Sequence, residues 1–189
     1  MNSTTLAALG IAAALLNILG TIPYIRDILR GKTKPERMTW WIWAMLMGVI
    51  LAAQISEGAS WAIIWTATTV VLMVAIGVLS IRYGYGRMER RDYIALLLAV
   101  TGVILWKITE NALVAVMLVV AVDAVAAWLT AVKTWRAPQT ETLVSWVAST
   151  AAAALNILSA HTFNLVIIAY AVYAFVANAV ITSILVSRR

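Results

Sequence analysis

The chain has 189 residues, of which 63% are hydrophobic and 12% are charged, with a formal net charge of +6. Soluble domains are usually about 45–50% apolar and about 25% charged, so this composition excludes a water-soluble globule and predicts a membrane protein. The absence of cysteine excludes disulfides, thiolate metal sites and cysteine nucleophiles. The positive charge is divided among several loops, which argues against nucleic-acid binding.

Seven apolar segments are predicted to cross the bilayer, because a transmembrane helix needs about 20 mostly apolar residues. The connections between them are short, so no soluble domain is expected. The N-terminus lacks the basic region of a cleavable signal peptide, so the first segment is expected to remain as a span. In chain order the segments are Leu6–Leu29, Met38–Ile55, Ser60–Ile81, Tyr93–Trp106, Ala112–Val132, Leu143–Ala160 and Phe163–Val186.

Basic residues divide almost completely between the two sides of this topology. Apart from Lys107, the 14 lysine and arginine residues lie at or beyond the end of the first, third, fifth or seventh span. The positive-inside rule assigns those loops to the cytoplasm. We therefore expect a multi-pass protein of the cell inner (plasma) membrane, with its N-terminus outside and its C-terminus in the cytoplasm.

An internal repeat is indicated at the starts of the second and sixth spans. Two ten-residue stretches align there at an offset of 103 residues. The hydropathy pattern of three, one and three spans predicts two parallel three-helix repeats, residues 1–84 and 110–189, around a linker helix in residues 85–109. The aligned pairs are Pro35 with Pro138, Thr39 with Thr142 and Trp43 with Trp146.

The first repeat resembles the PQ-loop and SWEET superfamily between Asn17 and Trp43. In that superfamily a first helix ends in Pro-Gln-Ile or a close variant, a basic loop follows, and Ser or Thr opens the next helix. Here Pro23-Tyr24-Ile25 stands in place of that motif, and Thr39 opens the next helix. The second repeat has no proline at the corresponding position.

This resemblance implies three-helix bundles flanking a pathway for a small solute, with prolines such as Pro23 acting as hinges for alternating access. In the sugar-facilitator branch, an asparagine on the last helix of each repeat contacts the substrate. Asn178 would fill that role, but the first repeat has Ala75 at the same offset. The second half also resembles uncharacterised prokaryotic membrane proteins, a likeness that implies no activity.

Asp123 lies near the middle of the apolar segment Ala112–Val132. A carboxylate at this depth costs roughly 2.5–3.5 kcal/mol on insertion scales, so it must be protonated, paired or facing a wet cavity. One interpretation makes it a proton-coupling or substrate-binding group. The other makes it a structural hydrogen-bond partner of a neighbouring helix.

Three asparagines, Asn17, Asn156 and Asn178, also lie within predicted spans. Each amide either contacts a solute or forms an interhelical hydrogen bond. Asn17 shares one helical face with Tyr24 and Gly20. That face either lines a pathway or marks a close helix contact at Gly20.

Most of the nine tryptophans are predicted to lie in interfacial belts, where the ring is apolar and the indole N–H reaches water. Trp128 and Trp146 lie deeper in their spans and are predicted to stack on a ring-shaped solute. The predicted belt residues are Trp61, Trp65 and Trp106 on the outer side and Trp40, Trp41, Trp43 and Trp135 on the inner side.

The sequence thus predicts an all-α transporter for a small polar solute, with proton coupling left open. The alternative is a non-transporting receptor, chaperone or assembly partner that docks through its basic loop Arg26–Arg37. No enzyme motif, cofactor site or metal site is expected. The expected partners are the solute and the lipid bilayer, and homo-oligomerisation is left open. The predicted solute contacts are Asp123, Asn17, Tyr24, Trp146, Asn156 and Asn178, with Pro23 as the hinge.

Overall fold

The computed structural model describes residues 2–31, 35, 37–84, 90–136, 138 and 143–188. Over these residues it contains seven α-helices, one for each predicted apolar segment, so the predicted all-α class is confirmed. Thr142, one of the aligned residues, lies outside the described residues. The helices are α1 (Ser3–Leu29), α2 (Arg37–Ser56), α3 (Ala62–Tyr83), α4 (Arg90–Thr109), α5 (Ala112–Arg136), α6 (Leu143–Ser159) and α7 (Leu165–Arg188).

Four helices, α1, α3, α5 and α7, are long and apolar enough to cross a membrane by length and composition. α2 and α6 contain the shorter apolar helices Trp40–Ser56 and Leu143–Ser159. Large apolar side chains such as Leu19, Val71 and Ile108 are exposed on the outside of the bundle. Apolar surface of this kind is suited to lipid and not to water. The chain is therefore a multi-pass membrane protein.

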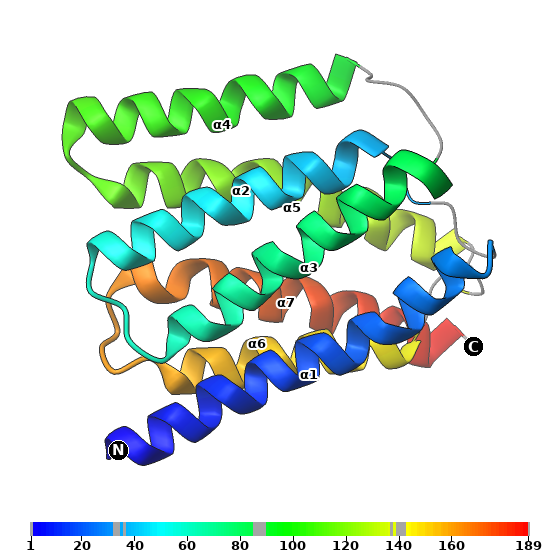
Figure 1. Cartoon of the computed structure of the whole chain (residues 1–189), viewed down its shortest axis with the longest axis horizontal. Coiled ribbons are helices and arrows are strands. Elements are labelled where there is room, and N and C mark those ends of the chain that lie inside the picture. Colours follow the sequence, from blue (N-terminus) through cyan, green and yellow to red (C-terminus); the bar gives the residue numbers. More distant parts are fainter. Residues whose placement is uncertain are drawn as a thin grey trace.

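The helices lie side by side along the longest axis of the molecule, and the two termini lie at opposite ends (Figure 1). α1, α3, α5 and α7 finish at the end that carries the C-terminus, and α2, α4 and α6 begin there. We call this the basic end, because six of the described arginines lie near it: Arg26, Arg30, Arg82, Arg90, Arg136 and Arg188. Lys107 is in the last turn of α4, at the opposite end.

Six helices surround a common centre. α3 packs against both α1 and α2, and α7 packs against both α5 and α6. α1 packs along α6, and α2 packs against α5, which closes the ring. α4 packs on α5 and α2 from outside this ring. Within the described ranges, neither the α1–α2 pair nor the α5–α6 pair forms an extensive interface.

Glycine permits the closest approach between α1 and its neighbours. A Cβ atom on Gly20 would lie 2.9 Å from the Cβ of Ala148 on α6, and the Ser145 hydroxyl donates to the Gly20 carbonyl at 3.1 Å. The close contact anticipated at Gly20 is therefore made with α6. α1 continues through Pro23 as a single helix.

Gly10 provides a test of this packing. A Cβ atom there would lie 2.5 Å from the backbone carbonyl oxygen of Trp61, which cannot rotate away as a flexible side chain would. Overpacking of this kind typically costs about 1–3 kcal/mol, so Gly10→Ala is expected to lower the melting temperature of the detergent-solubilised protein. Gly48→Ala is the matched control, since nothing lies within 4 Å of a Cβ at Gly48. Equal melting temperatures for the two variants would contradict the described α1–α3 contact.

Candidate functional site

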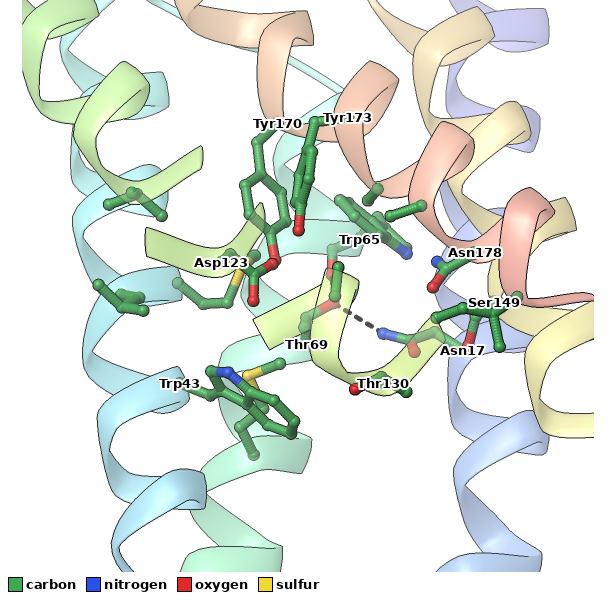
Figure 2. A pocket seen from close by; sticks show the side chains of 18 of the residues that line it. Asn17, Trp43, Trp65, Thr69, Asp123, Thr130, Ser149, Tyr170, Tyr173 and Asn178 are labelled. Atoms are coloured by element: carbon green, nitrogen blue, oxygen red, sulfur yellow. Dashed lines mark hydrogen bonds between the residues drawn. The ribbon is translucent and has the colours of Figure 1, made fainter. Parts of the chain in front are cut away.

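A cavity of about 250 Å³ lies at the centre of the ring and is lined by every helix except α4. Polar lining residues come from five helices and aromatic ones from four (Figure 2). The polar residues are Asn17, Thr69, Asp123, Thr130, Ser149 and Asn178, and the aromatic residues are Trp40, Trp43, Trp65, Trp146, Tyr170 and Tyr173.

The cavity extends from the middle of the bundle toward the basic end. Asn17, Asp123 and Asn178 are near the midpoints of their helices, and Trp40 is in the first turn of α2 at the basic end. Trp65 and Tyr170, near the starts of α3 and α7, line the side toward the opposite end. The lining residues thus range in depth from the early turns of α3 and α7, near the opposite end, to the basic end.

Asp123 accepts a hydrogen bond from a tyrosine on α7. The hydroxyl of Tyr170 donates to Oδ2 of Asp123 at 3.0 Å, and the Tyr173 ring packs on Tyr170 with centroids 5.7 Å apart. The Tyr173 hydroxyl is buried and has no hydrogen-bond partner in the described part of the chain. Asp123 therefore forms the interhelical hydrogen bond of the second interpretation and also faces the cavity (Figure 2). Its role in proton coupling or substrate binding stays a prediction.

The two asparagines on the cavity differ in their partners. Asn17 Nδ2 donates to Thr69 Oγ1 at 2.7 Å, and the Thr69 hydroxyl donates to the Trp65 carbonyl at 2.8 Å (Figure 2). Asn178 and Ser149 form no hydrogen bond with any described residue, and both are on the cavity wall. The buried indole N–H of Trp65 likewise has no acceptor among the described residues. The cavity wall therefore offers several polar groups that a solute could bind.

Tyr24, Asn156 and Pro23 do not line the cavity, unlike Asp123, Asn17, Trp146 and Asn178. Tyr24 packs its ring on Trp40 with centroids 5.3 Å apart, so it contacts a lining residue. Asn156 is 1% exposed, accepts from the Ser159 hydroxyl at 3.4 Å, and has no described partner for its Nδ2. Solute contact by Tyr24 and Asn156, and the hinge role of Pro23, stay predictions.

Three tryptophans predicted for the interfacial belts line the cavity instead. Trp65 is only 6% exposed, and its ring centroid lies 6.4 Å from that of Tyr170. Trp40 and Trp43 pack edge to face at 5.2 Å on the same wall. The belt prediction was wrong for Trp65, whose buried indole N–H does not reach water, because it used distance from the segment end and ignored the helical face. The interfacial depth of Trp40 and Trp43 stays a prediction.

The prediction for Trp128 was also wrong, since its side chain is 70% exposed on the outside of α5. The residues of α5 that face the cavity include Asp123, Ala127 and Thr130, spaced as one face of a helix. Trp128 lies away from that face. Trp146, predicted together with it, does line the cavity.

Tyr170 and Tyr173 are the important lining residues that sequence reasoning missed. They share a helical face with Asn178, and Ala174 and Ile181 continue it. Extending the face of Asn178 back along its helix would have found both tyrosines. A tyrosine side chain is long and carries a polar hydroxyl on an apolar ring. Two such side chains within an apolar segment were the signal for a hydrogen bond to a neighbouring helix.

Side-chain hydrogen bonds join two connections at the opposite end of the bundle, beyond the cavity. Ser60 Oγ and His161 Nδ1 are 3.0 Å apart, and Asn164 Nδ2 donates to Glu57 Oε2 at 2.8 Å. Each bond links the α2–α3 connection to the α6–α7 connection. Nearby, the fully buried Gln54 donates to the carbonyl of Ile167 at 2.7 Å. His161 is exposed and has this partner.

Comparisons of the chain with family models, with curated proteins and with solved structures found no match. We therefore infer a function from the geometry of the cavity and from the arrangement of the helices around it.

Proposed function

We propose that this protein is a transporter of SWEET/PQ-loop type for a small polar solute and works by alternating access. The observation that carries this proposal is the central cavity, because it reaches a membrane-embedded carboxylate and offers unpaired polar groups from several helices. Intramembrane ionisable groups are typical of solute and proton pathways. Transporter sites are typically found near the bilayer midplane between repeats.

The packing order supports two parallel repeats, residues 1–84 and 110–189, around the linker helix in residues 85–109. Among the first three helices, α3 packs against both α1 and α2. Among the last three, α7 packs in the same way against both α5 and α6. The α1–α6 and α5–α2 interfaces are equivalent under this pairing. Trp43 and Trp146, paired by the sequence offset, both line the cavity.

In this proposal all seven helices cross the inner (plasma) membrane, and the basic end lies in the cytoplasm with the C-terminus. Asp123 binds or titrates, and Asn17, Asn178 and Trp146 contact the solute. Tyr24 acts through Trp40, Asn156 supports α6, and Pro23 allows α1 to flex. Opening toward the opposite end would require the Glu57–Asn164 and Ser60–His161 hydrogen bonds to separate.

Uptake into proteoliposomes tests the proposal. The full chain would be reconstituted and offered a radiolabelled hexose, a neutral amino acid, a nucleoside and choline, each with and without a pH gradient. We expect saturable uptake of at least one solute above protein-free liposomes. Stimulation by the gradient would add proton coupling. Background uptake in every case, with correctly folded protein, would favour a receptor or assembly partner.

A further inference from the structure

The cavity contains one carboxyl group, that of Asp123, and no described basic side chain faces it. Among the described lining residues, Asp123 is the only one with an ionisable carboxyl group, and none is Lys, Arg or His. The only ion pair found among the described side chains, between Arg26 and Asp27, is near the end of α1. A buried carboxylate without a positive partner is strongly destabilised. A ligand that brings a positive charge would remove this penalty.

Aromatic groups lie near that carboxyl group. Tyr170 donates to Asp123, and the rings of Tyr173 and Trp65 both pack near the Tyr170 ring. Trp43 lines the cavity from α2 (Figure 2). The faces of tryptophan and tyrosine rings attract cations, most strongly where water is excluded. A carboxylate with several aromatic rings nearby is therefore suited to an ammonium group.

A metal ion fits this wall less well than an organic cation does. Calcium and magnesium ions take about six or more oxygen ligands, and the described residues contain no cluster of three or more His, Asp or Glu side chains that could hold a metal ion. Most of the wall is aromatic or apolar. The volume of about 250 Å³ is below the about 300–1,000 Å³ of pockets for drug-sized ligands. The occupant is thus expected to be small.

The remaining polar groups indicate the rest of the ligand. Asn178 and Ser149, on α7 and α6, lack described hydrogen-bond partners and belong to the same cavity as Asp123. In Figure 2 they lie on the other side of the cavity from Asp123. A hydroxyl or carbonyl group a few bonds from the ammonium could bind there.

We propose that the cavity binds a small organic cation, a protonated amine or quaternary ammonium that also carries a hydroxyl or carbonyl group. The proposal rests on the proposed function in that it concerns the same solute site, and it narrows the substrate class. A neutral sugar would use the same tryptophans and amides but would leave the charge of Asp123 uncompensated.

Equilibrium binding to the full chain in lipid nanodiscs tests this inference. The probes are choline, ethanolamine, glucose and the neutral carbon isostere of choline, in which a tert-butyl group replaces the trimethylammonium group. We expect choline to bind at least about tenfold more tightly than its isostere, since the two differ in charge and scarcely in shape. This comparison needs no variant and is unaffected by folding defects.

The second arm uses Asp123→Asn, which removes the charge and nearly keeps the shape. It is expected to lose the preference for choline over the isostere, whereas Glu110→Gln, a matched change at an exposed carboxylate, keeps it. Equal binding of choline and its isostere, an unchanged preference in Asp123→Asn, or no binding of either cation would overturn the inference.

Uptake of glucose without cation binding would also overturn the inference while leaving the transporter proposal in place. Cation binding without uptake of choline or ethanolamine into proteoliposomes would support the inference and count against transport. The two failures are therefore distinguishable.

Discussion

Cross-linking the α2–α3 connection to the α6–α7 connection is expected to abolish uptake. The chain contains no cysteine, so Ser60→Cys together with His161→Cys introduces the only two thiols. The native side chains at these positions are hydrogen-bonded at 3.0 Å, which is within reach of a short bifunctional thiol reagent. We expect uptake to fall at least about tenfold, because alternating access requires this end of the bundle to open.

A reagent with a reducible linker makes the test reversible, and uptake should return when the linker is cleaved. The matched control is Glu57→Cys with Ser60→Cys, where both thiols belong to the same connection and the cross-link joins nothing across the bundle. Full uptake by a quantitatively cross-linked Ser60/His161 pair would show that this end does not separate during transport. The single-cysteine variants, treated with the same reagent, measure the effect of modification alone.

Asp123→Asn is expected to reduce the initial rate of uptake by about tenfold or more. The reason is the loss of a charged hydrogen-bonding group on the cavity wall, where such bonds contribute about 1.5–3 kcal/mol and about 1.4 kcal/mol is a factor of ten. Tyr170→Phe should have a smaller effect, because it removes one hydrogen bond and keeps the ring next to Trp65.

The double variant Asp123→Asn with Tyr170→Phe tests whether the two side chains act together or contact the solute independently. If the Tyr170 hydroxyl acts by orienting Asp123, the double variant should transport within a factor of about two of Asp123→Asn alone. Initial rates in proteoliposomes with equal amounts of folded protein provide the measurement. Multiplicative losses would mean that Tyr170 contacts the solute independently. Uptake unchanged by Asp123→Asn would remove this carboxylate from the mechanism.

The sequence by itself determined the number of helices and the separation of charge between the two ends of the bundle. Both properties are local. An apolar segment of sufficient length forms a helix in lipid because every backbone N–H and C=O must be satisfied within the segment. Basic residues collect where the chain leaves the membrane. The seven helices and the position of Lys107 opposite the described arginines follow from these two rules.

The sequence also identified Asp123, Asn17 and Asn178 as candidate site residues, because polar groups within an apolar segment are costly in lipid and are usually paired or functional. It could not say which face of each helix pointed inward. In a water-soluble protein the polar face marks the outside, but here the lipid-facing and buried faces are both apolar. Trp65 and Trp128 were misassigned for this reason, one being buried at the cavity and the other exposed.

Only the tertiary structure decided which side chains on different helices contact one another. The Tyr170–Asp123 hydrogen bond joins residues 47 positions apart, and the Asn17–Thr69 bond joins residues 52 apart. The contact of Gly20 with α6 spans most of the chain. Such pairings depend on how six similar apolar helices sort around a centre, through small residues and interhelical hydrogen bonds. That sorting is a property of the whole ring, and it brings the carboxylate, the amides and the aromatic rings to one cavity.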